Sequence, residues 1–313
     1  MGVIEVEGIT TEYGNDVGID SLSFSVDSGE AFGLLGPQGA GKTTTIRTIL
    51  GFQSPRTGTT RVLGCDVHSE RGRREVTDEI GYVPATPGYD DRASIGQILD
   101  AHEAVHGGDR RDVLIERFGL EEDRRIHALG PREQRLLALV VAFMHDPSVA
   151  ILDEPTTGVD PVTRQRIVGF IDEERRRGTT VLLSSRSVDS MVRLCDRIAV
   201  LWSGRRIRTE TPASLPFTTA KQVSITVERE TDMTAFDRLQ IENFVSHDTE
   251  VPPPAGSGPE TPPVAATTCS FLYTGPPARL LESIAPLECL TYRIEPAPVA
   301  ETLLATYEDL PPE

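Results

Sequence analysis

The sequence predicts an α/β fold with a parallel core sheet, followed by a small α+β domain. Short apolar runs of buried-strand type recur along the first two hundred residues. The first of these runs leads into a glycine-rich turn and a helix. The last hundred residues change in character, which indicates a second domain. The four runs expected in the core are Ala31–Leu35, Val149–Leu152, Thr180–Ser184 and Ile198–Trp202.

The glycine-rich turn spells G-x-x-x-x-G-K-T from Gly36 to Thr43 and precedes a helix expected from Thr43 to Leu50. Glycines let the backbone N–H groups point inward at phosphate oxygens, and the helix N-terminus adds partial positive charge. Lys42 is expected to reach the β- and γ-phosphates, and the Thr43 hydroxyl to bind Mg²⁺. The pattern predicts a nucleoside triphosphate site. Its expected residues are Gly36, Pro37, Gln38, Gly39, Ala40, Gly41, Lys42, Thr43 and Thr44.

Two adjacent carboxylates, Asp153 and Glu154, follow the apolar run Val149–Leu152. Burying an unpaired charge is costly, so two adjacent carboxylates at the end of a buried strand indicate a functional site. Because successive side chains along a strand point in opposite directions, the two carboxylates are expected to face different surroundings. We expect Asp153 to hold Mg²⁺ through water and Glu154 to face the attacking water as the catalytic base.

Composition limits the remaining possibilities. There are 48 acidic and 31 basic residues, a net charge of −17, and the two lysines are Lys42 and Lys221. This balance opposes nucleic-acid binding and suggests a halophilic protein, although a GC-rich genome that favours arginine codons is a competing explanation. The arginine run at 175–177 is expected to be a solvated helix face. The four cysteines are scattered, which indicates reduced thiols in a cytosolic protein.

Residues 216–313 are expected to form a ferredoxin-like α+β domain, because strand, helix, strand, strand, helix and strand follow in that order. A mobile Pro-rich loop is expected at 252–266. No signal peptide and no apolar stretch of about 20 residues is found, so any membrane domain is expected on another chain. The predicted strands are Gln222–Glu228, Phe244–Val251, Thr268–Tyr273 and Leu290–Ile294, and the helices are Thr234–Leu239, Pro277–Ile284 and Val299–Leu310.

Residues 3 to 210 resemble the ATP-binding subunits of ABC transporters. Ordered matches carry the resemblance: Tyr13-Gly14, Ser28-Gly29-Glu30, the phosphate loop, Ile80–Pro84, Leu152–Thr156, Gly158–Pro161 and Leu194–Leu201. The stretch Pro87–Asp91 and the appended C-terminal region resemble the drug, antibiotic and sodium exporter branch. The resemblance implies a P-loop NTPase fold of ABC type over residues 1–215. It also implies an antiparallel edge sheet containing Val3–Glu7 and Leu22–Val26, a helical subdomain at about 90–145, and Tyr13 stacked on adenine.

Three sequence elements depart from the family pattern. Ala85 stands where the family has a glutamine near Mg²⁺ and the attacking water, and Arg186 replaces the switch histidine. A guanidinium stays charged and cannot relay a proton as imidazole does. The signature L-S-G-G-Q aligns with residues 128–132, where Leu129 lacks a hydroxyl and Pro131 lacks an N–H. Arg132 could recover part of the lost phosphate binding through its charge.

The resemblance implies the ATP-binding subunit of an exporter-type transporter, with ATP and Mg²⁺ as ligands and weak or asymmetric hydrolysis. Its implied partners are a separate transmembrane permease and a second ABC ATPase subunit, preferably a different chain. It would be cytoplasmic and peripheral on the inner face of the cell membrane. One alternative is a non-hydrolysing regulatory or scaffold subunit. A soluble role in translation or DNA repair is disfavoured, since the chain has neither two cassettes nor a long coiled coil. The transported substrate is chosen by the membrane subunit.

Overall fold

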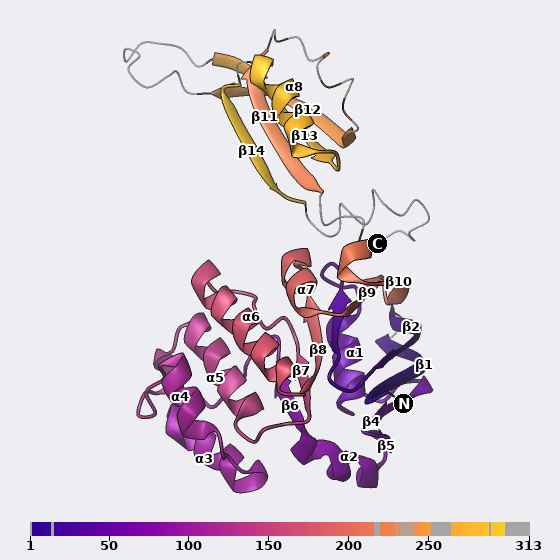
Figure 1. The fold of residues 1–313 in the computed structure, drawn as a ribbon, viewed down its shortest axis with the longest axis vertical. Coiled ribbons are helices and arrows are strands. Elements are labelled where there is room, and N and C mark those ends of the chain that lie inside the picture. The colour runs from indigo at the N-terminus through magenta and orange to yellow at the C-terminus, as the bar shows by residue number, and fades with distance from the viewer. Residues whose placement is uncertain are drawn as a thin grey trace. The chain divides into compact units, whose positions relative to one another are not determined.

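The protein is described by a computed structural model that covers residues 2–13, 16–215, 220–229, 241–251, 264–287 and 289–297, with single residues at 231, 234, 236 and 239. The chain divides into two compact units, the first ending at Ser214 and the second beginning at Leu215. Figure 1 shows the elements of each unit.

The first unit is built on a six-stranded sheet with the order β10-β9-β3-β8-β7-β6. Strands β9 to β6 are parallel, and β10 turns back at Ser203 and Gly204 to pair antiparallel with β9. The central strands β3, β7 and β8 are buried along their whole length, which explains their continuous apolar sequences. The strands are β3 (Ala31–Leu35), β6 (Ile80–Val83), β7 (Val149–Leu152), β8 (Thr180–Ser185), β9 (Arg197–Trp202) and β10 (Arg205–Glu210).

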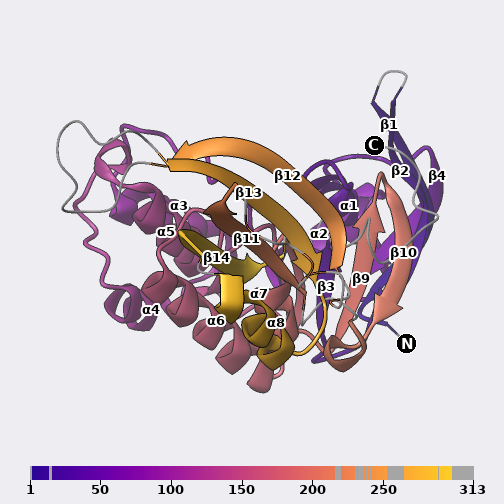
Figure 2. The same cartoon turned by 90° about the horizontal axis from the view of Figure 1, so that it is seen from above.

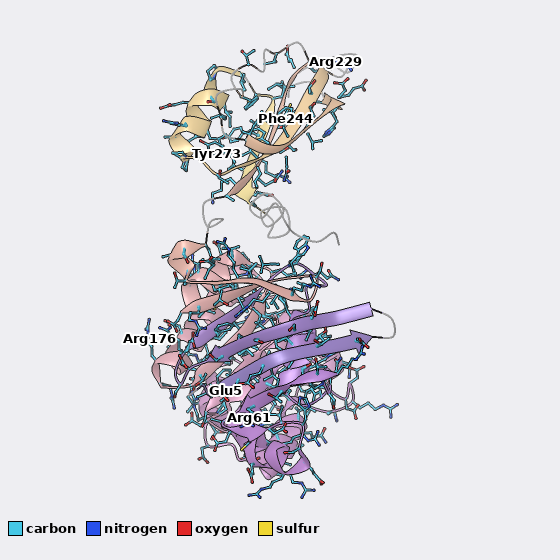
Figure 3. The ribbon with its side chains drawn as sticks, turned by 90° about the vertical axis from the view of Figure 1, so that its right-hand side faces the viewer. Glu5, Arg61, Arg176, Arg229, Phe244 and Tyr273 are labelled. Atoms are coloured by element: carbon cyan, nitrogen blue, oxygen red, sulfur yellow. The ribbon has the colours of Figure 1, made fainter. Side chains whose placement is uncertain are left out.

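An antiparallel sheet with the order β2-β1-β4-β5 lies at one edge of this unit. Glu5 of β1 and Arg61 of β4 are direct register partners (Figure 3). Phe24 of β2 stacks on Phe32 of β3 with 5.0 Å between ring centroids, which joins the two sheets. Both long strands exceed their predicted lengths because shifts of register interrupt the alternation of β1. The strands are β1 (Ile4–Tyr13), β2 (Asp16–Val26), β4 (Thr57–Val62) and β5 (Cys65–Asp66).

Helices α3 to α6 gather on the side of the core sheet away from the edge sheet (Figures 1 and 2). A capping box of Ser94 and Gln97 starts α3, and Asp160 caps α6. The helical subdomain expected at about 90–145 corresponds to α3, α4 and α5. The helices are α1 (Lys42–Ile49), α2 (Glu70–Val76), α3 (Ile95–His106), α4 (Arg111–Phe118), α5 (Pro131–Phe143), α6 (Pro161–Arg176) and α7 (Val188–Leu194).

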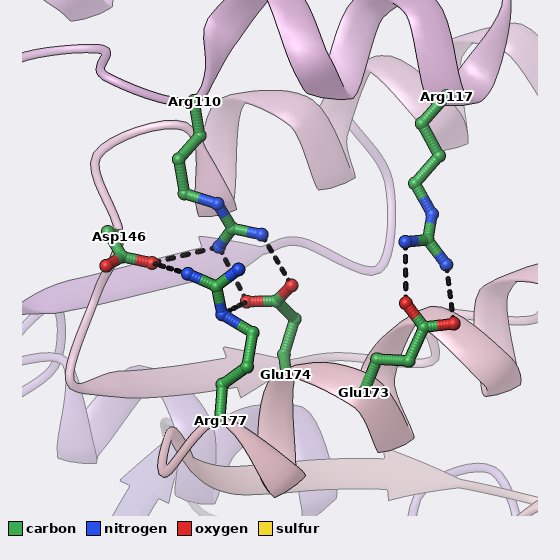
Figure 4. A network of polar contacts seen from close by, with 6 residues as sticks. All are labelled: Arg110, Arg117, Asp146, Glu173, Glu174 and Arg177. Atoms are coloured by element: carbon green, nitrogen blue, oxygen red, sulfur yellow. Dashed lines mark hydrogen bonds and ion pairs between the residues drawn. The ribbon is translucent and has the colours of Figure 1, made fainter.

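Ion pairs join α4 to α6 (Figure 4). Arg110 makes two hydrogen bonds of 2.6 Å to Glu174, whose side chain is only 2% exposed. Arg117 pairs with Glu173 in the same two-pronged way. The side chains of Arg176 and Arg177 are 71% and 53% exposed, so this arginine run is a solvated face, and Arg177 also approaches Asp146 and Glu174. The arginines of this surface are paired with acids, and Asp146 and Glu174 are each shared by Arg110 and Arg177.

The second unit contains a four-stranded antiparallel sheet with the order β12-β13-β11-β14. This is the strand order of a ferredoxin-like fold, as predicted. Buried Phe271 and Tyr273 pack with Leu280 of α8, and the hydroxyl of Tyr273, which is labelled in Figure 3, donates to the carbonyl of Pro276. The elements are β11 (Lys221–Glu228), β12 (Ile241–Val251), β13 (Val264–Tyr273), α8 (Pro277–Ile284) and β14 (Thr291–Pro296).

Some predictions for the second unit fall on residues that are not described. The helix expected at Val299–Leu310 lies wholly outside the described residues, and most of the one expected at Thr234–Leu239 does too. The loop expected at 252–266 ends earlier, since β13 begins at Val264, and residues 252–263 lie outside the described part. Among the helices that the structure describes, none combines the length and apolar character needed to cross a bilayer.

Candidate functional site

The phosphate loop lies between the end of β3 and the start of α1 and borders a cavity of about 520 Å³. Gly41 caps α1 with a φ of +96°, a conformation that side chains other than glycine rarely adopt. A Cβ on Gly36 would lie 2.4 Å from the carbonyl oxygen of Leu201, so this glycine is needed for close packing. The cavity is lined by Gly18, Gln38, Gly39, Ala40, Gly41, Lys42, Thr43, Thr44, Ala85, Thr86, Glu154, Thr157 and Arg186.

Lys42 folds back over its own loop. Its Nζ donates to the carbonyls of Gly36 at 2.8 Å and Pro37 at 2.7 Å, and lies 3.6 Å from Glu154 Oε1. Burial lowers the pKa of the Lys42 ammonium, while the Glu154 carboxylate acts in the opposite direction. The ammonium is thus held at the cavity by groups that a phosphate could replace.

Asp153 is fully buried where β7 ends, and a serine of the neighbouring strand holds it. Ser184 Oγ donates to Asp153 Oδ1 at 2.5 Å and accepts from the backbone N–H of Glu154 at 2.9 Å. The other oxygen, Asp153 Oδ2, is buried without a protein hydrogen-bond partner among the described residues. A buried carboxylate oxygen left free in this way fits a Mg²⁺ site completed by water and phosphate oxygens. Ser184 was not among the predicted site residues, although its position at the end of an adjacent predicted strand was a signal for it.

Glu154 is the other carboxylate of this strand end and points into the cavity. Its φ of +50° is unusual for a residue with a side chain, and such conformations gather at functional sites. Thr157 Oγ1 donates to Glu154 Oε2 at 2.8 Å, and Arg186 Nε lies 3.5 Å from Oε1. Glu154 is therefore surrounded by Lys42, Thr157 and Arg186.

The loop that carries Ala85 is fixed through its backbone. Arg135 of α5 donates at 2.6 Å to the carbonyls of both Pro84 and Ala85. Burial lowers the pKa of this guanidinium, with Asp153 and Glu154 opposing the shift. Ala85 lines the cavity, and the hydrogen bonds from Arg135 hold its loop in place without the amide of a glutamine.

The signature stretch, residues 128–132, does not line the cavity, and its residues make their contacts within the chain. Leu129 is buried, and the N–H of Gly130 donates to Glu133 Oε2 at 3.0 Å. Pro131 is the first residue of α5, where its missing N–H does not harm the helix. Leu129, a core residue, thus stands where the family has the signature serine. The N–H of Gly130 is already bonded to Glu133.

The structure brings most of the predicted site residues together at the cavity. Asp153 lies next to it, linked through the backbone and Ser184. Tyr13 ends β1, but its side chain lies outside the described residues, as does Gly14. The roles of these residues remain proposals.

Comparison with known proteins identifies the family. The sequence model of the ABC transporter family matches residues 19–157. The chain is 36% identical over 220 residues to the Nod factor export ATP-binding protein I of Paraburkholderia xenovorans, covering 68% of this chain and 72% of that protein. It is 37% identical over 220 residues to the protein of the same name from Mesorhizobium japonicum, covering 68% of this chain but only 64% of that protein's length.

Solved structures agree with this result. An ATP-binding subunit of an ABC transporter superimposes with a TM-score of 0.62 at 26% identity, covering 67% of this chain and 90% of that one. A dimeric bacterial ABC transporter cassette superimposes with a TM-score of 0.63 at 18% identity, covering 68% of this chain and all of that one, which shows the shared fold. The predicted P-loop fold is confirmed, and the chain belongs to the ABC transporter family of ATP-binding proteins.

Proposed function

We propose that this protein is the ATP-binding subunit of an exporter-type ABC transporter, which binds Mg-ATP and couples it to a separate membrane permease. One observation carries the proposal: the glycine loop, Lys42 and Glu154 converge on a single cavity beside buried Asp153. The names of these relatives refer to export, which favours an exporter.

The residues have distinct proposed roles. The backbone N–H groups of residues 36–43 and the ammonium of Lys42 bind phosphates, and Tyr13 stacks on adenine. Thr43 and Asp153 hold Mg²⁺, which would neutralise phosphate charge. Glu154, beside the cavity and oriented by Thr157, accepts the proton of the attacking water.

Hydrolysis is proposed to be weak or asymmetric. Ala85 offers no polar group to the attacking water, and Arg186 cannot relay a proton. The alternative is a non-hydrolysing regulatory subunit that ATP merely stabilises. One observation supports this alternative. Arg186 forms an ion pair with Glu154, the proposed catalytic base. ATP turnover by the purified chain with a candidate partner separates the two.

The proposed partners are a transmembrane permease and a second cassette, preferably a different chain with an intact signature. This assembly would place the protein at the inner face of the membrane. A net charge of −17 gives no support to nucleic acid as a partner.

The test uses the two lysines of the chain, Lys42 and Lys221. Lys42→Ala should abolish measurable Mg-ATP binding in a titration carried out in molar potassium chloride, because it removes the buried phosphate-binding cation. Lys221→Ala makes the same change of charge in the second unit and should bind ATP like the wild type. Equal affinity in the wild type and Lys42→Ala, with an unchanged circular dichroism spectrum, would refute the assignment.

A further inference from the structure

Three histidines meet at the end of α3, in a part of the first unit that the nucleotide cavity does not include. His102 and His106 lie one helical turn apart on one face of α3, and His145 closely follows α5. The centroids of the three rings are 4.7, 5.1 and 5.7 Å apart. All three rings line a cavity of about 270 Å³ whose other walls include residues of α1, α2 and β6. This histidine cluster therefore lies between α3 and the core of the unit.

The hydrogen bond inside the histidine cluster depends on the charge of its rings. Nε2 of His102 lies 3.1 Å from Nδ1 of His145, so one ring must donate and the other must accept. When both rings are protonated, both atoms become donors and the bond is lost. The neutral state of this pair is thus the one that the observed contact requires.

Few fixed charges face the histidine cluster. Nδ1 of His106 donates to Asp78 at 2.7 Å, and Asp146 follows the third histidine in the chain. The side chains of these two acids are 69% and 58% exposed, so water screens their charge. Of the described residues that line the cavity, Arg73 alone carries a fixed charge, and it is a cation. Burial raises the pKa of Tyr82 to about 12, so that this phenol of the cavity wall stays neutral.

These surroundings favour uncharged rings in the folded protein. Burial, together with the other two rings, lowers the pKa of His102 to about 4. Burial also lowers the pKa of His145, although the Ile80 backbone and the two acids act in the opposite direction. A histidine of the unfolded chain has a pKa of about 6.5 and therefore takes up a proton at a pH where the folded ring does not. The stability that neutral rings provide is complete above this pH and is lost as the pH falls through it.

We propose that the histidine cluster is a pH-sensitive switch, which holds the end of α3 against the core when neutral and releases it on acidification. Protonated rings at these separations repel one another, and their charges draw water into the cavity. The end of α3 then separates from β6 and from the turn after α5. The switch needs no nucleotide, so it stands independently of the proposed function.

The experiment follows the whole chain without nucleotide at pH 7.5 and pH 5.5. Trp202, the only tryptophan, is buried in β9, so its fluorescence reports urea unfolding of the first unit. The double variant His102→Gln/His145→Asn places amides that do not titrate where the bonded ring nitrogens lie. Acidification should raise the unfolding equilibrium constant of the wild type about 10- to 100-fold more than that of the double variant, at about tenfold for each ring kept neutral.

Amide hydrogen exchange locates the effect. When both proteins are compared at the same pH, the intrinsic pH dependence of exchange cancels. At pH 5.5 the amides of α3 should exchange about tenfold faster in the wild type than in the double variant, and the difference should be smaller in α6. His247→Asn removes an exposed histidine of β12 in the second unit and should keep the full response of the wild type.

Equal responses to acidification in the wild type and the double variant, or equal acceleration of exchange in α3 and α6, would overturn the inference. If the double variant does not fold, nuclear magnetic resonance of the wild-type imidazoles, assigned with the single variant His102→Gln, decides instead. Titration of the His102 ring below about pH 5.5 would support the switch, and titration above that pH would overturn it.

Discussion

The phosphate loop and the signature stretch are two halves of the family's nucleotide machinery, and they differ in how their polar groups are satisfied. Around the loop, Asp153 Oδ2 is buried without a protein hydrogen bond, and Lys42 rests on the carbonyls of its own loop. In the signature stretch, Leu129 is buried and the Gly130 N–H is bonded to Glu133. The loop half thus keeps a buried carboxylate oxygen to which a ligand could bind, whereas the Gly130 N–H of the signature stretch is already bonded within the chain.

The largest expected effect concerns catalysis in the loop half. Ala85→Gln with Arg186→His restores an amide and a titratable imidazole next to Glu154, and should raise turnover of ATP. General acid–base groups contribute roughly 10²–10⁴-fold, so a partial gain is measurable by phosphate release. The gain should appear in kcat more than in KM, because the restored groups act on the reaction.

Two controls sharpen this prediction. Adding Glu154→Gln to the double variant should remove the gained activity, since the proposed base is then absent. A wild-type chain that already turns over at about 10 s⁻¹, an ordinary enzyme rate, would show that neither position limits the reaction.

An intermediate effect is expected in assembly across the signature half. Glu154→Gln with Mg-ATP should remain monomeric in sedimentation, because the signature offers neither a hydroxyl at Leu129 nor an N–H at Pro131. Leu129→Ser with Pro131→Gly should produce ATP-dependent association, with itself or with a partner cassette. A tight ATP-dependent homodimer of Glu154→Gln alone, abolished by Arg132→Ala, would contradict the comparison and give Arg132 the serine's role.

The smallest effect is on stability. Leu129 is 6% exposed, so Leu129→Ser leaves a cavity and buries a hydroxyl, and should lower the free energy of unfolding by about 3 kcal/mol. Val162→Ser is the matched control at a position that is 69% exposed, and should change it by less than about 0.5 kcal/mol. The free energies of unfolding of the two variants, measured by urea denaturation, test this prediction. Equal stability would mean that the signature leucine is not part of the core.

Local patterns predicted the elements that depend on nearest neighbours. The phosphate loop, the buried strands and α8 were predicted with bounds within one or two residues, because each is marked by glycine spacing, apolar runs or amphipathic periodicity. The contacts of Arg135 and Glu174 could not be predicted, because each depends on a residue about 50 or more positions away. Long-range pairing of this kind follows from the fold and leaves no mark in local sequence.

The two-pronged ion pairs between α4 and α6 have a mechanical consequence for the first unit. Arg110 and Arg117 are two helical turns apart, and their acceptors Glu174 and Glu173 are adjacent on α6. The Phe170 ring of α6 packs edge-on against Phe118 of α4 and Phe143 of α5. The two ion pairs and the ring contacts of Phe170 oppose a change in the angle between α4 and α6. The helical subdomain is thus tied through α4 to α6, and through Arg135 of α5 to the loop that carries Ala85, so these contacts link α6 mechanically to the nucleotide cavity.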